Sequence, residues 1–341
     1  MEIKKNYSKF EKWYPYSGLI YLKKQGEEKM RIPKLLKQTV IFLYKYIEES
    51  NEYHALGTGF FIGLIEEDSF FPYLVTCKHV IKDSIDDGHT IHGRFNIAEE
   101  MDVGFEPFPN EWVYHDDPAI DLAILSWPKT GENPPYRWGA LPFNDAIYRP
   151  IDVPIMDGGV VEGDEVFFVG LFTQFTGIKR NYPIVRFGKV ALLTDELIHT
   201  ELGLSKNILI ECQAYPGNSG SPLFIPTKTK NGEIVASLLG VIAGYWPDTQ
   251  EIYVEDEKSL KVFSHFGISM AVPAPKISDI LYGKEFMKQR EEKKNSARMK
   301  RMPMPAKNEL KGINAEMSKE EFLNVLKMAS SPNDESPDDD K

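Results

Sequence analysis

Ser219 lies between two glycines, in the stretch Gly217-Asn218-Ser219-Gly220. Glycine tolerates a positive φ and has no Cβ, so a chain with this spacing can bend sharply and approach a ligand closely. An exposed serine hydroxyl beside unpaired backbone N–H groups supplies a nucleophile and an oxyanion hole, which are two parts of an acyl-transfer site. A serine in a glycine-rich turn is also favoured for structural reasons alone, because its hydroxyl bonds to its own backbone. The interpretation as a nucleophile therefore needs a base and a group that orients the base.

Both partners have candidates upstream of the serine. His79 ends an apolar run that begins at Leu74, whereas the surroundings of other histidines are polar or loop-like, as at His89, His92, His115, His199 and His265. An orienting carboxylate must be buried against the imidazole. Asp121 is followed at once by an apolar run, whereas Asp116 and Asp117 lie in a polar turn. We therefore predict that His79 is a general base and that Asp121 orients it.

Four motifs in a fixed order carry a resemblance to a known family. They are Gly57-Thr58-Gly59-Phe60 ahead of Val75-Thr76-Cys77-Lys78-His79, then Asp121-Leu122-Ala123-Ile124-Leu125, then Gly217-Asn218-Ser219-Gly220-Ser221-Pro222, and last Gly267-Ile268-Ser269-Met270-Ala271-Val272-Pro273. The order His, Asp, Ser is that of chymotrypsin and differs from the orders in subtilisin and the α/β-hydrolases. Over roughly residues 38–282, the chain resembles trypsin/chymotrypsin-like serine peptidases, in particular bacterial and viral members without disulfides.

The resemblance implies a set of roles for these residues. Ser219 would attack a peptide carbonyl, His79 would shuttle the proton, and Asp121 would hold the imidazole tautomer. The backbone N–H groups of Gly217 and Ser219 would form the oxyanion hole. The resemblance also places Gln213 at the floor of the primary specificity pocket, where a neutral residue argues against a strict preference for Lys or Arg. The wall of that pocket would be formed by Ala243, Gly244 and Tyr245. No metal or cofactor is implied.

Asn218 departs from the pattern of trypsin-like zymogens, in which an aspartate at this position pairs with a newly freed N-terminus. A neutral amide cannot make that ion pair. We therefore do not expect activation by N-terminal trimming.

Short apolar runs separated by Gly, Pro and Asp at intervals of about ten residues predict an all-β sandwich or barrel. The resemblance sharpens this to two six-stranded antiparallel β-barrels of the trypsin-like type, joined by a connection over residues 129–150. We expect an N-terminal extension (1–37), a first barrel with His79 and Asp121 (38–150), a second barrel with Ser219 (151–283) and a charged helical and disordered tail (284–341).

The tail differs in composition from the rest of the chain. A charged helix is predicted over residues 276–302, and a capping-box pattern at Ser318 starts a second, amphipathic helix before an acidic end over residues 332–341. A short helix alone is marginal in water. We therefore expect the tail to dock on the barrels or on a regulatory protein partner.

Charge and cysteine usage exclude several classes of protein. The formal net charge of −11 argues against a nucleic-acid-binding surface, which needs an excess of Lys and Arg. No apolar run approaches the ~20 residues of a membrane helix, so no membrane role is expected. The chain has only two cysteines, Cys77 and Cys212, and no secretory signal is apparent, which favours a reducing compartment and a cytoplasmic location. Both should be free thiols.

Cys77 is an alternative nucleophile for His79. A Cys–His pair is chemically reasonable, but residues two apart on a strand share one face at a spacing of about 6–7 Å. We interpret both cysteines instead as small buried apolar residues.

The sequence therefore predicts a cytoplasmic serine endopeptidase that acts on protein or peptide substrates. Two alternatives remain: a catalytically silent, trypsin-like pseudoprotease that binds a protein partner through its cleft, and an esterase-like acyl transferase that uses the same site. Labelling by a fluorophosphonate probe distinguishes the first alternative from the enzyme, because the probe reacts with an activated serine.

Overall fold

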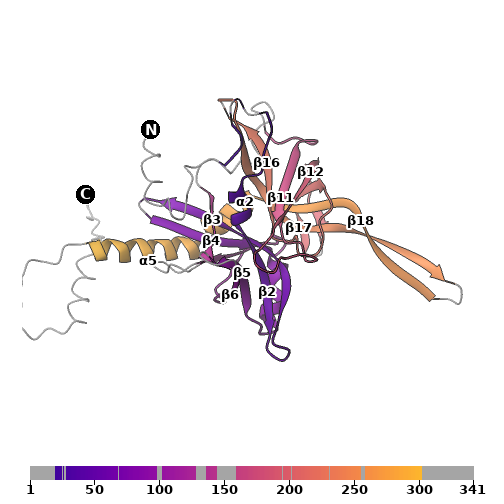
Figure 1. The fold of residues 1–341 in the computed structure, drawn as a ribbon, viewed down its shortest axis with the longest axis horizontal. Helices are drawn as coiled ribbons and strands as arrows, with labels where there is room; N and C mark the ends of the chain where they lie inside the picture. The colour runs from indigo at the N-terminus through magenta and orange to yellow at the C-terminus, as the bar shows by residue number, and fades with distance from the viewer. Residues whose placement is uncertain are drawn as a thin grey trace, which may run out of the picture. The chain divides into compact units, whose positions relative to one another are not determined.

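The fold consists almost entirely of antiparallel β-structure in two sheets (Figure 1). It is known from a computed structural model. The residues that the structure describes are 20–24, 26, 28–67, 69–97, 102–127, 136–143, 159–193, 195–200, 202–229, 231–254 and 258–301.

The first sheet follows the order β6-β5-β2-β3-β4-β8-β7, with β9 on β5 and β10 parallel to β3. Its strands are β2 (Val40–Ile47), β3 (Glu52–Glu66), β4 (Ser69–Thr76), β5 (Ile91–Ile97), β6 (Val103–Pro107), β7 (Val113–Tyr114), β8 (Ala123–Ser126), β9 (Tyr136–Arg137) and β10 (Leu141–Pro142). Two short helices accompany it, α2 (Lys34–Gln38) and α3 (Lys78–Asp86). Aromatic rings fill its core: Trp127 stacks on Phe95 at 5.1 Å and on Phe61 at 5.5 Å between ring centroids.

The second sheet closes on itself as a six-stranded antiparallel barrel. The ring runs β17-β16-β11-β12-β15-β18 and returns to β17, which leaves no open edge between these strands. Its strands are β11 (Glu165–Gly170), β12 (Ile184–Leu192), β15 (Ile208–Glu211), β16 (Pro222–Lys228), β17 (Ile234–Val254) and β18 (Lys258–Pro273). A separate hairpin, β13 (Ile198–Thr200) and β14 (Gly203–Ser205), lies between β12 and β15 in the chain.

The two sheets share a core, which fixes how they face each other. One cluster of buried apolar side chains includes Phe42 and Phe60 of the first sheet together with Phe167 and Phe224 of the second. Phe167 and Phe224 stack at 5.3 Å between ring centroids. Residues contributed by different sheets can therefore be held in a constant geometry at their junction.

The predicted fold class is confirmed, and the strand count of the first sheet differs from the expectation. The second barrel has the expected six strands, whereas the described part of the first sheet has nine. The additional strands β9 and β10 come from the segment expected to be a connection, because Leu141 is only 1% exposed and pairs with Ile62 of β3. The expected N-terminal extension also contributes structure, since β1 (Tyr21–Lys23) pairs with β17.

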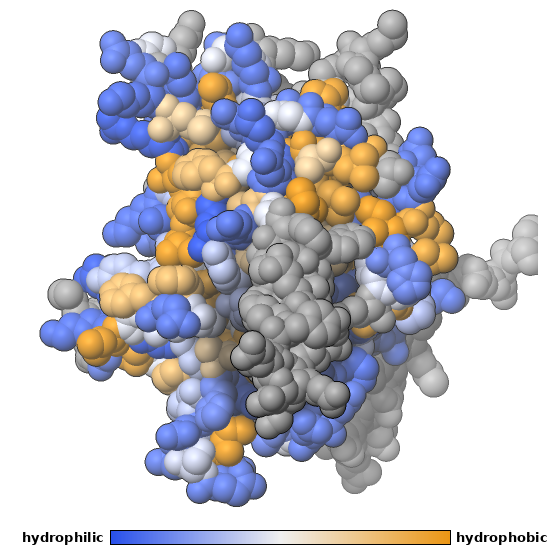
Figure 2. Space-filling model, turned by 90° about the vertical axis from the view of Figure 1, so that its right-hand side faces the viewer, coloured by the Kyte–Doolittle hydropathy of each residue, from blue (hydrophilic) through white to orange (hydrophobic). Residues whose placement is uncertain are grey.

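The β17–β18 hairpin continues beyond the barrel as a two-stranded ribbon (Figure 1). The pairing continues as far as Val254 with Lys258. At about 3.3 Å per residue, the stretch from Tyr245 to Val254 spans about 30 Å. On the face shown in Figure 2, hydrophobic residues lie in a band across the upper middle of the view, with mostly hydrophilic residues above and below it.

The charged helix predicted over residues 276–302 is two helices, α4 (Pro275–Leu281) and α5 (Lys284–Arg301). The first turns of α5 belong to the fold: Phe286 is fully buried, with its ring centroid 4.9 Å from that of Tyr73. Arg290, 3% exposed, donates from Nη1 to the Leu281 carbonyl at 2.7 Å.

The predicted amphipathic helix at Ser318, the acidic end and any partner of the tail lie outside the described residues and stay predictions. None of the described helices is long and apolar enough to cross a membrane.

The docking of α5 makes a first prediction. Phe286→Ala should lower the free energy of unfolding by about 3–5 kcal/mol, because it leaves a cavity beside Tyr73. Lys288→Ala is the matched control on the same helix, since Lys288 is exposed. Urea denaturation measures both variants. Equal stability of the two would contradict the docking of α5 on the first sheet.

Candidate active site

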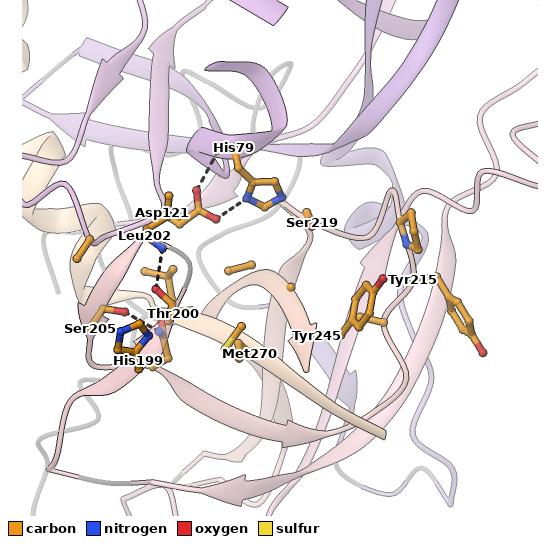
Figure 3. Close-up of a pocket in the computed structure, with 17 residues that line it drawn as sticks. His79, Asp121, His199, Thr200, Leu202, Ser205, Tyr215, Ser219, Tyr245 and Met270 are labelled. Carbon is orange, nitrogen blue, oxygen red and sulfur yellow. Dashed lines mark hydrogen bonds and ion pairs between the residues drawn. The ribbon is translucent and has the colours of Figure 1, made fainter. Parts of the chain in front are cut away.

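His79, Asp121 and Ser219 lie together at one cavity of about 710 Å³ (Figure 3). It is lined by α3, by the loop before β8, by the β13–β14 hairpin and by residues of the second barrel. His79 comes from the first turn of α3 and Asp121 from the residues just before β8. Ser219 comes from the turn just before β16. The structure therefore brings together three residues that were predicted from separate motifs.

The His79 ring is oriented by Asp121. The imidazole Nδ1 lies 2.5 Å from Asp121 Oδ2, and the carboxyl-bearing residue is only 8% exposed. A carboxylate accepts hydrogen bonds, so Nδ1 carries the proton and Nε2 is left as a base. In Figure 3 the imidazole lies between Asp121 and the side chain of Ser219.

The position of His79 corrects the expectation that it ends a strand. β4 ends at Thr76, Cys77 is the N-cap residue of α3, and His79 lies in the first helical turn. The first N–H groups of a helix have no acceptor within the helix. The backbone N–H of His79 uses Asp121 Oδ1 as its acceptor at 3.0 Å. Asp121 therefore also stabilises the N-terminus of α3, where a negative charge is favourable.

Both glycines beside Ser219 are required by the backbone. Gly217 has a φ of +95° and Gly220 a φ of +85°, and residues that carry a side chain rarely adopt such values. A Cβ at Gly220 would lie 1.9 Å from the Thr58 carbonyl oxygen, and one at Gly217 would lie 2.6 Å from Thr173 Cγ2. The tight packing explains the Gly-x-Ser-Gly spacing in physical terms.

Hydrogen bonds hold the turn with its carbonyls toward the protein. Thr58 donates from its backbone N–H to the Ser219 carbonyl at 2.9 Å and from Oγ1 to the Gly217 carbonyl at 2.7 Å. Gly220 donates to the Ile242 carbonyl at 2.7 Å. Within the described part of the chain, the N–H groups of Gly217 and Ser219 donate to no acceptor. These two donors are therefore available to a ligand oxygen.

Asn218 is buried, and its amide oxygen and nitrogen both form hydrogen bonds with neutral backbone groups. Its side chain accepts a hydrogen bond from the Tyr215 N–H at 2.8 Å and donates one to the Leu171 carbonyl at 2.6 Å. An aspartate could accept the first bond but could not donate the second. The turn is therefore held at this position by an amide and without an ion pair.

Of the predicted pocket residues, the structure places Ala243, Gly244 and Tyr245 on the cavity and Gln213 elsewhere. Gln213 is exposed, and its Oε1 accepts a hydrogen bond from the Tyr215 hydroxyl at 3.0 Å. The described lining that sequence reasoning did not assign consists of Ala119, His199, Thr200, Leu202, Ser205, Asn207, Ala214, Tyr215, Pro216, Met270 and Val272.

Two of these missed contributions have identifiable origins. Met270 belongs to the fourth sequence motif and pairs with Gly244 across β17 and β18, so the motif already contained a signal. The β13–β14 hairpin approaches the first sheet, since a Cβ on Gly203 would lie 3.5 Å from that of Ala119. Nothing in the local pattern of that hairpin indicates this contact.

Cys77 lies next to this site as a buried thiol. Its Sγ donates to the Ile242 carbonyl at 3.2 Å. Burial, and then the nearby Asp121 charge, raise the pKa of the Cys77 thiol well above its ordinary value. Cys212 is also free and buried, as predicted. Cys77 is therefore a thiol at neutral pH and a poor nucleophile.

The ligand atoms of Cys77, His79 and Asp121 lie within 4.8 Å of one another. Both Asp121 oxygens are already hydrogen-bonded by His79, and the Cys77 thiol is turned to a carbonyl. These three residues are accounted for without a metal.

Comparison with known proteins identifies a family. A family model described as "Trypsin-like peptidase domain" matches residues 57–236. The chain therefore belongs to the trypsin-like peptidase domain family.

Solved structures similar to the chain are also peptidases by title. The MamO protease domain from Magnetospirillum magneticum is 18% identical with a TM-score of 0.42, and the match covers 73% of this chain and 98% of that one. An inactive form of the Rv3671c protease is 18% identical with a TM-score of 0.38, covering 72% and 88%. The thermostable serine protease AL20 from an extremophilic microorganism is 12% identical with a TM-score of 0.40, covering 72% and 96%. No curated protein matches the chain.

The state of the cysteines makes a second prediction. Because burial raises the pKa of both thiols, iodoacetamide at pH 8 should modify neither Cys77 nor Cys212 in the native protein. Intact-mass spectrometry after unfolding in guanidinium should then show both thiols alkylated. Rapid native-state alkylation of Cys77 would instead indicate a reactive thiolate beside His79.

Proposed function

We propose that the chain is a serine endopeptidase that cleaves protein or peptide substrates through an acyl-enzyme on Ser219. One observation carries the proposal: a buried carboxylate orients His79 from 2.5 Å on the same cavity as Ser219, which lies in a turn with two free N–H groups. Nucleophile, base, orienting group and oxyanion donors are the parts that acyl transfer needs.

The geometry supports a sequence of proton movements. Ser219 Oγ attacks the carbonyl carbon of the scissile peptide while His79 Nε2 accepts the hydroxyl proton. The imidazolium that forms is stabilised by Asp121. His79 then donates this proton to the leaving amine, and an ester to Ser219 remains. Water, deprotonated by the same nitrogen, hydrolyses the ester and frees the serine.

The N–H groups of Gly217 and Ser219 stabilise the negative oxygen that develops during both attacks. Hydrogen bonds from Thr58 to the Gly217 and Ser219 carbonyls hold the turn that carries these two donors. In other proteases, removing one such donor costs about 10²–10³ in kcat. We therefore assign the oxyanion hole to these two groups.

The lining of the cavity supports a preference for uncharged side chains at the residue before the scissile bond. The lining of the cavity includes Ala214, Ala243, Gly244 and Met270. Among the described lining residues, the only carboxylate is Asp121, which is committed to His79, and none is a lysine or arginine. A charged substrate side chain would lose its hydration there without gaining an ionic partner.

The proposed activity is tested by the nucleophile. Ser219→Ala should abolish cleavage of a fluorogenic peptide, with the thermal unfolding midpoint unchanged, because the substitution removes one oxygen at the cavity and no core packing. The matched control is Ser205→Ala, which removes a hydroxyl from the same cavity and should keep most of the activity. Full activity of Ser219→Ala would contradict the assignment. A wild type without any activity would favour the binding-module alternative.

The proposed selectivity is tested with peptides that differ in one residue. In a series with constant flanking sequence, kcat/KM for Leu, Met or Ala before the scissile bond should exceed that for Lys and for Asp by more than about tenfold. The Lys and Asp peptides differ in the sign of their charge. A loss of kcat/KM with both of them therefore follows from the presence of a charge and not from its sign. A preference for Lys or Arg would show that an acidic group reaches the pocket from elsewhere.

A further inference from the structure

Arg94 of β5 connects the first sheet to a segment of the second barrel. The segment is residues 171–183, which join β11 to β12, and we call it the β11–β12 segment. The side chain of Arg94 is 5% exposed. Its guanidinium donates four hydrogen bonds to that segment, to the carbonyls of Gly177 (2.6 Å), Thr176 (3.2 Å) and Ile178 (3.2 Å) and to Oδ1 of Asn181 (2.6 Å).

Asn181 returns these bonds. Its Nδ2 donates to the Arg94 carbonyl at 2.5 Å, and its backbone N–H donates to Oδ1 of Asn96 at 2.7 Å. Arg94 and Asn181 are thus bonded in both directions. The planar guanidinium can reach several acceptors at once, which a lysine ammonium on the same stem could not do in this geometry.

The acceptors of this buried cation are neutral. Burial lowers the pKa of Arg94, and Tyr44 and Asp102 oppose the effect at longer range. Burying a charge is costly unless it is well hydrogen-bonded. Removing the guanidinium would also take four hydrogen bonds from this partly buried segment. The hydrogen bonds of Arg94 therefore favour one ordered conformation of the β11–β12 segment.

The beginning of the ordered segment supports the serine turn. The Leu171 carbonyl accepts the Asn218 amide at 2.6 Å, and the Leu171 N–H donates to Thr58 Oγ1 at 3.0 Å. Thr173 packs against Gly217 so closely that a Cβ there would meet its Cγ2 at 2.6 Å. Any displacement of Leu171 and Thr173 would therefore release the peptide that carries the Gly217 N–H.

We propose that Arg94 is a positioning residue for the oxyanion hole. It holds the β11–β12 segment so that Leu171 and Thr173 keep the Gly217 N–H, which has no acceptor among the described residues, in its position in the serine turn. Arg94 acts through this segment and does not touch the substrate. This inference rests on the proposed peptidase activity and adds a long-range requirement to it: the first barrel supplies both the base and the support for the oxyanion donors.

The kinetic test compares two buried arginines. Arg94→Met should lower kcat per titrated active site by roughly tenfold or more, the scale of a weakened oxyanion donor, with KM unchanged within about threefold. Arg94→Lys should rescue only part of the loss. The matched control is Arg290→Met, at a residue that is 3% exposed and bonded to Leu281 and Tyr73. It should lower the unfolding midpoint and leave kcat per active site unchanged.

A double-mutant cycle adds a second kinetic criterion. Asn181→Ala should reduce kcat to a similar extent as Arg94→Met, and the double variant should lose little more than either single variant, because the two residues act as one unit. Wild-type kcat per active site in Arg94→Met, or fully additive losses, would overturn the proposal.

Hydrogen exchange tests the same inference without relying on activity. The N–H groups of Asn218 and Ser221 donate hydrogen bonds within the serine turn, and that of Gly220 donates to the Ile242 carbonyl of β17, so all three should be protected. In Arg94→Met, peptides covering residues 171–183 and this turn should both exchange faster, and in Arg290→Met neither should. Faster exchange of residues 171–183 with an unchanged turn would overturn the coupling. If the wild type proves inactive, the proposed function fails while this measurement still decides the role of Arg94.

Discussion

The site depends on one fully buried residue, Thr58 of β3. Its backbone N–H and hydroxyl bind the carbonyls of Ser219 and Gly217, and its own carbonyl accepts the hydroxyl of Thr76 at 2.7 Å. Thr76 ends the strand that leads into His79. The same residue thus fixes the turn that carries the nucleophile and the strand that delivers the base. Because these bonds are buried, losing any partner would leave an unsatisfied polar group at a cost of about 1–3 kcal/mol.

Two further supports act on the segment that follows β11: the amide of Asn218 and the guanidinium of Arg94 in β5. The Asn218 amide binds the Leu171 carbonyl, and Arg94 orders the chain that follows Leu171. On the other side of the cavity, the N-terminus of α3 and the Asp121 carboxylate stabilise each other while the carboxylate orients His79. His79, Asp121 and Ser219 are in this way held by hydrogen bonds to neighbouring segments, and the activity proposed above would use this preorganisation.

That His79, Asp121 and Ser219 would lie together could be predicted from sequence because each of them has a local signature. His79 and Asp121 adjoin apolar strands, and Ser219 is flanked by glycines that the turn needs. The position of Gln213 could not be predicted in this way. Its side chain accepts a hydrogen bond from the Tyr215 hydroxyl and does not line the cavity, and no local pattern indicates this contact. The role of Arg94 depends on packing between segments far apart in the chain, and a lone arginine in a strand carries no local signal for it.

The same contrast between local sequence pattern and contacts between distant segments holds for the fold. Alternating short apolar runs were sufficient to predict an all-β fold, whereas β9, β10 and β1 are too short to leave a periodic pattern and form only where a neighbouring strand offers a free edge. Helix α5 was predicted as part of a charged tail, and the burial of Phe286 against Tyr73 shows why composition alone misplaced its first turns.

The central claim is that Ser219 is an activated nucleophile, and labelling by a fluorophosphonate probe tests it most directly. We expect a single probe adduct per chain, located on Ser219 by tandem mass spectrometry. In Asp121→Asn the fold should be retained, and the adduct should form slowly or not at all. Labelling that is absent from the wild type, or that falls on another residue such as Cys77, would contradict the claim.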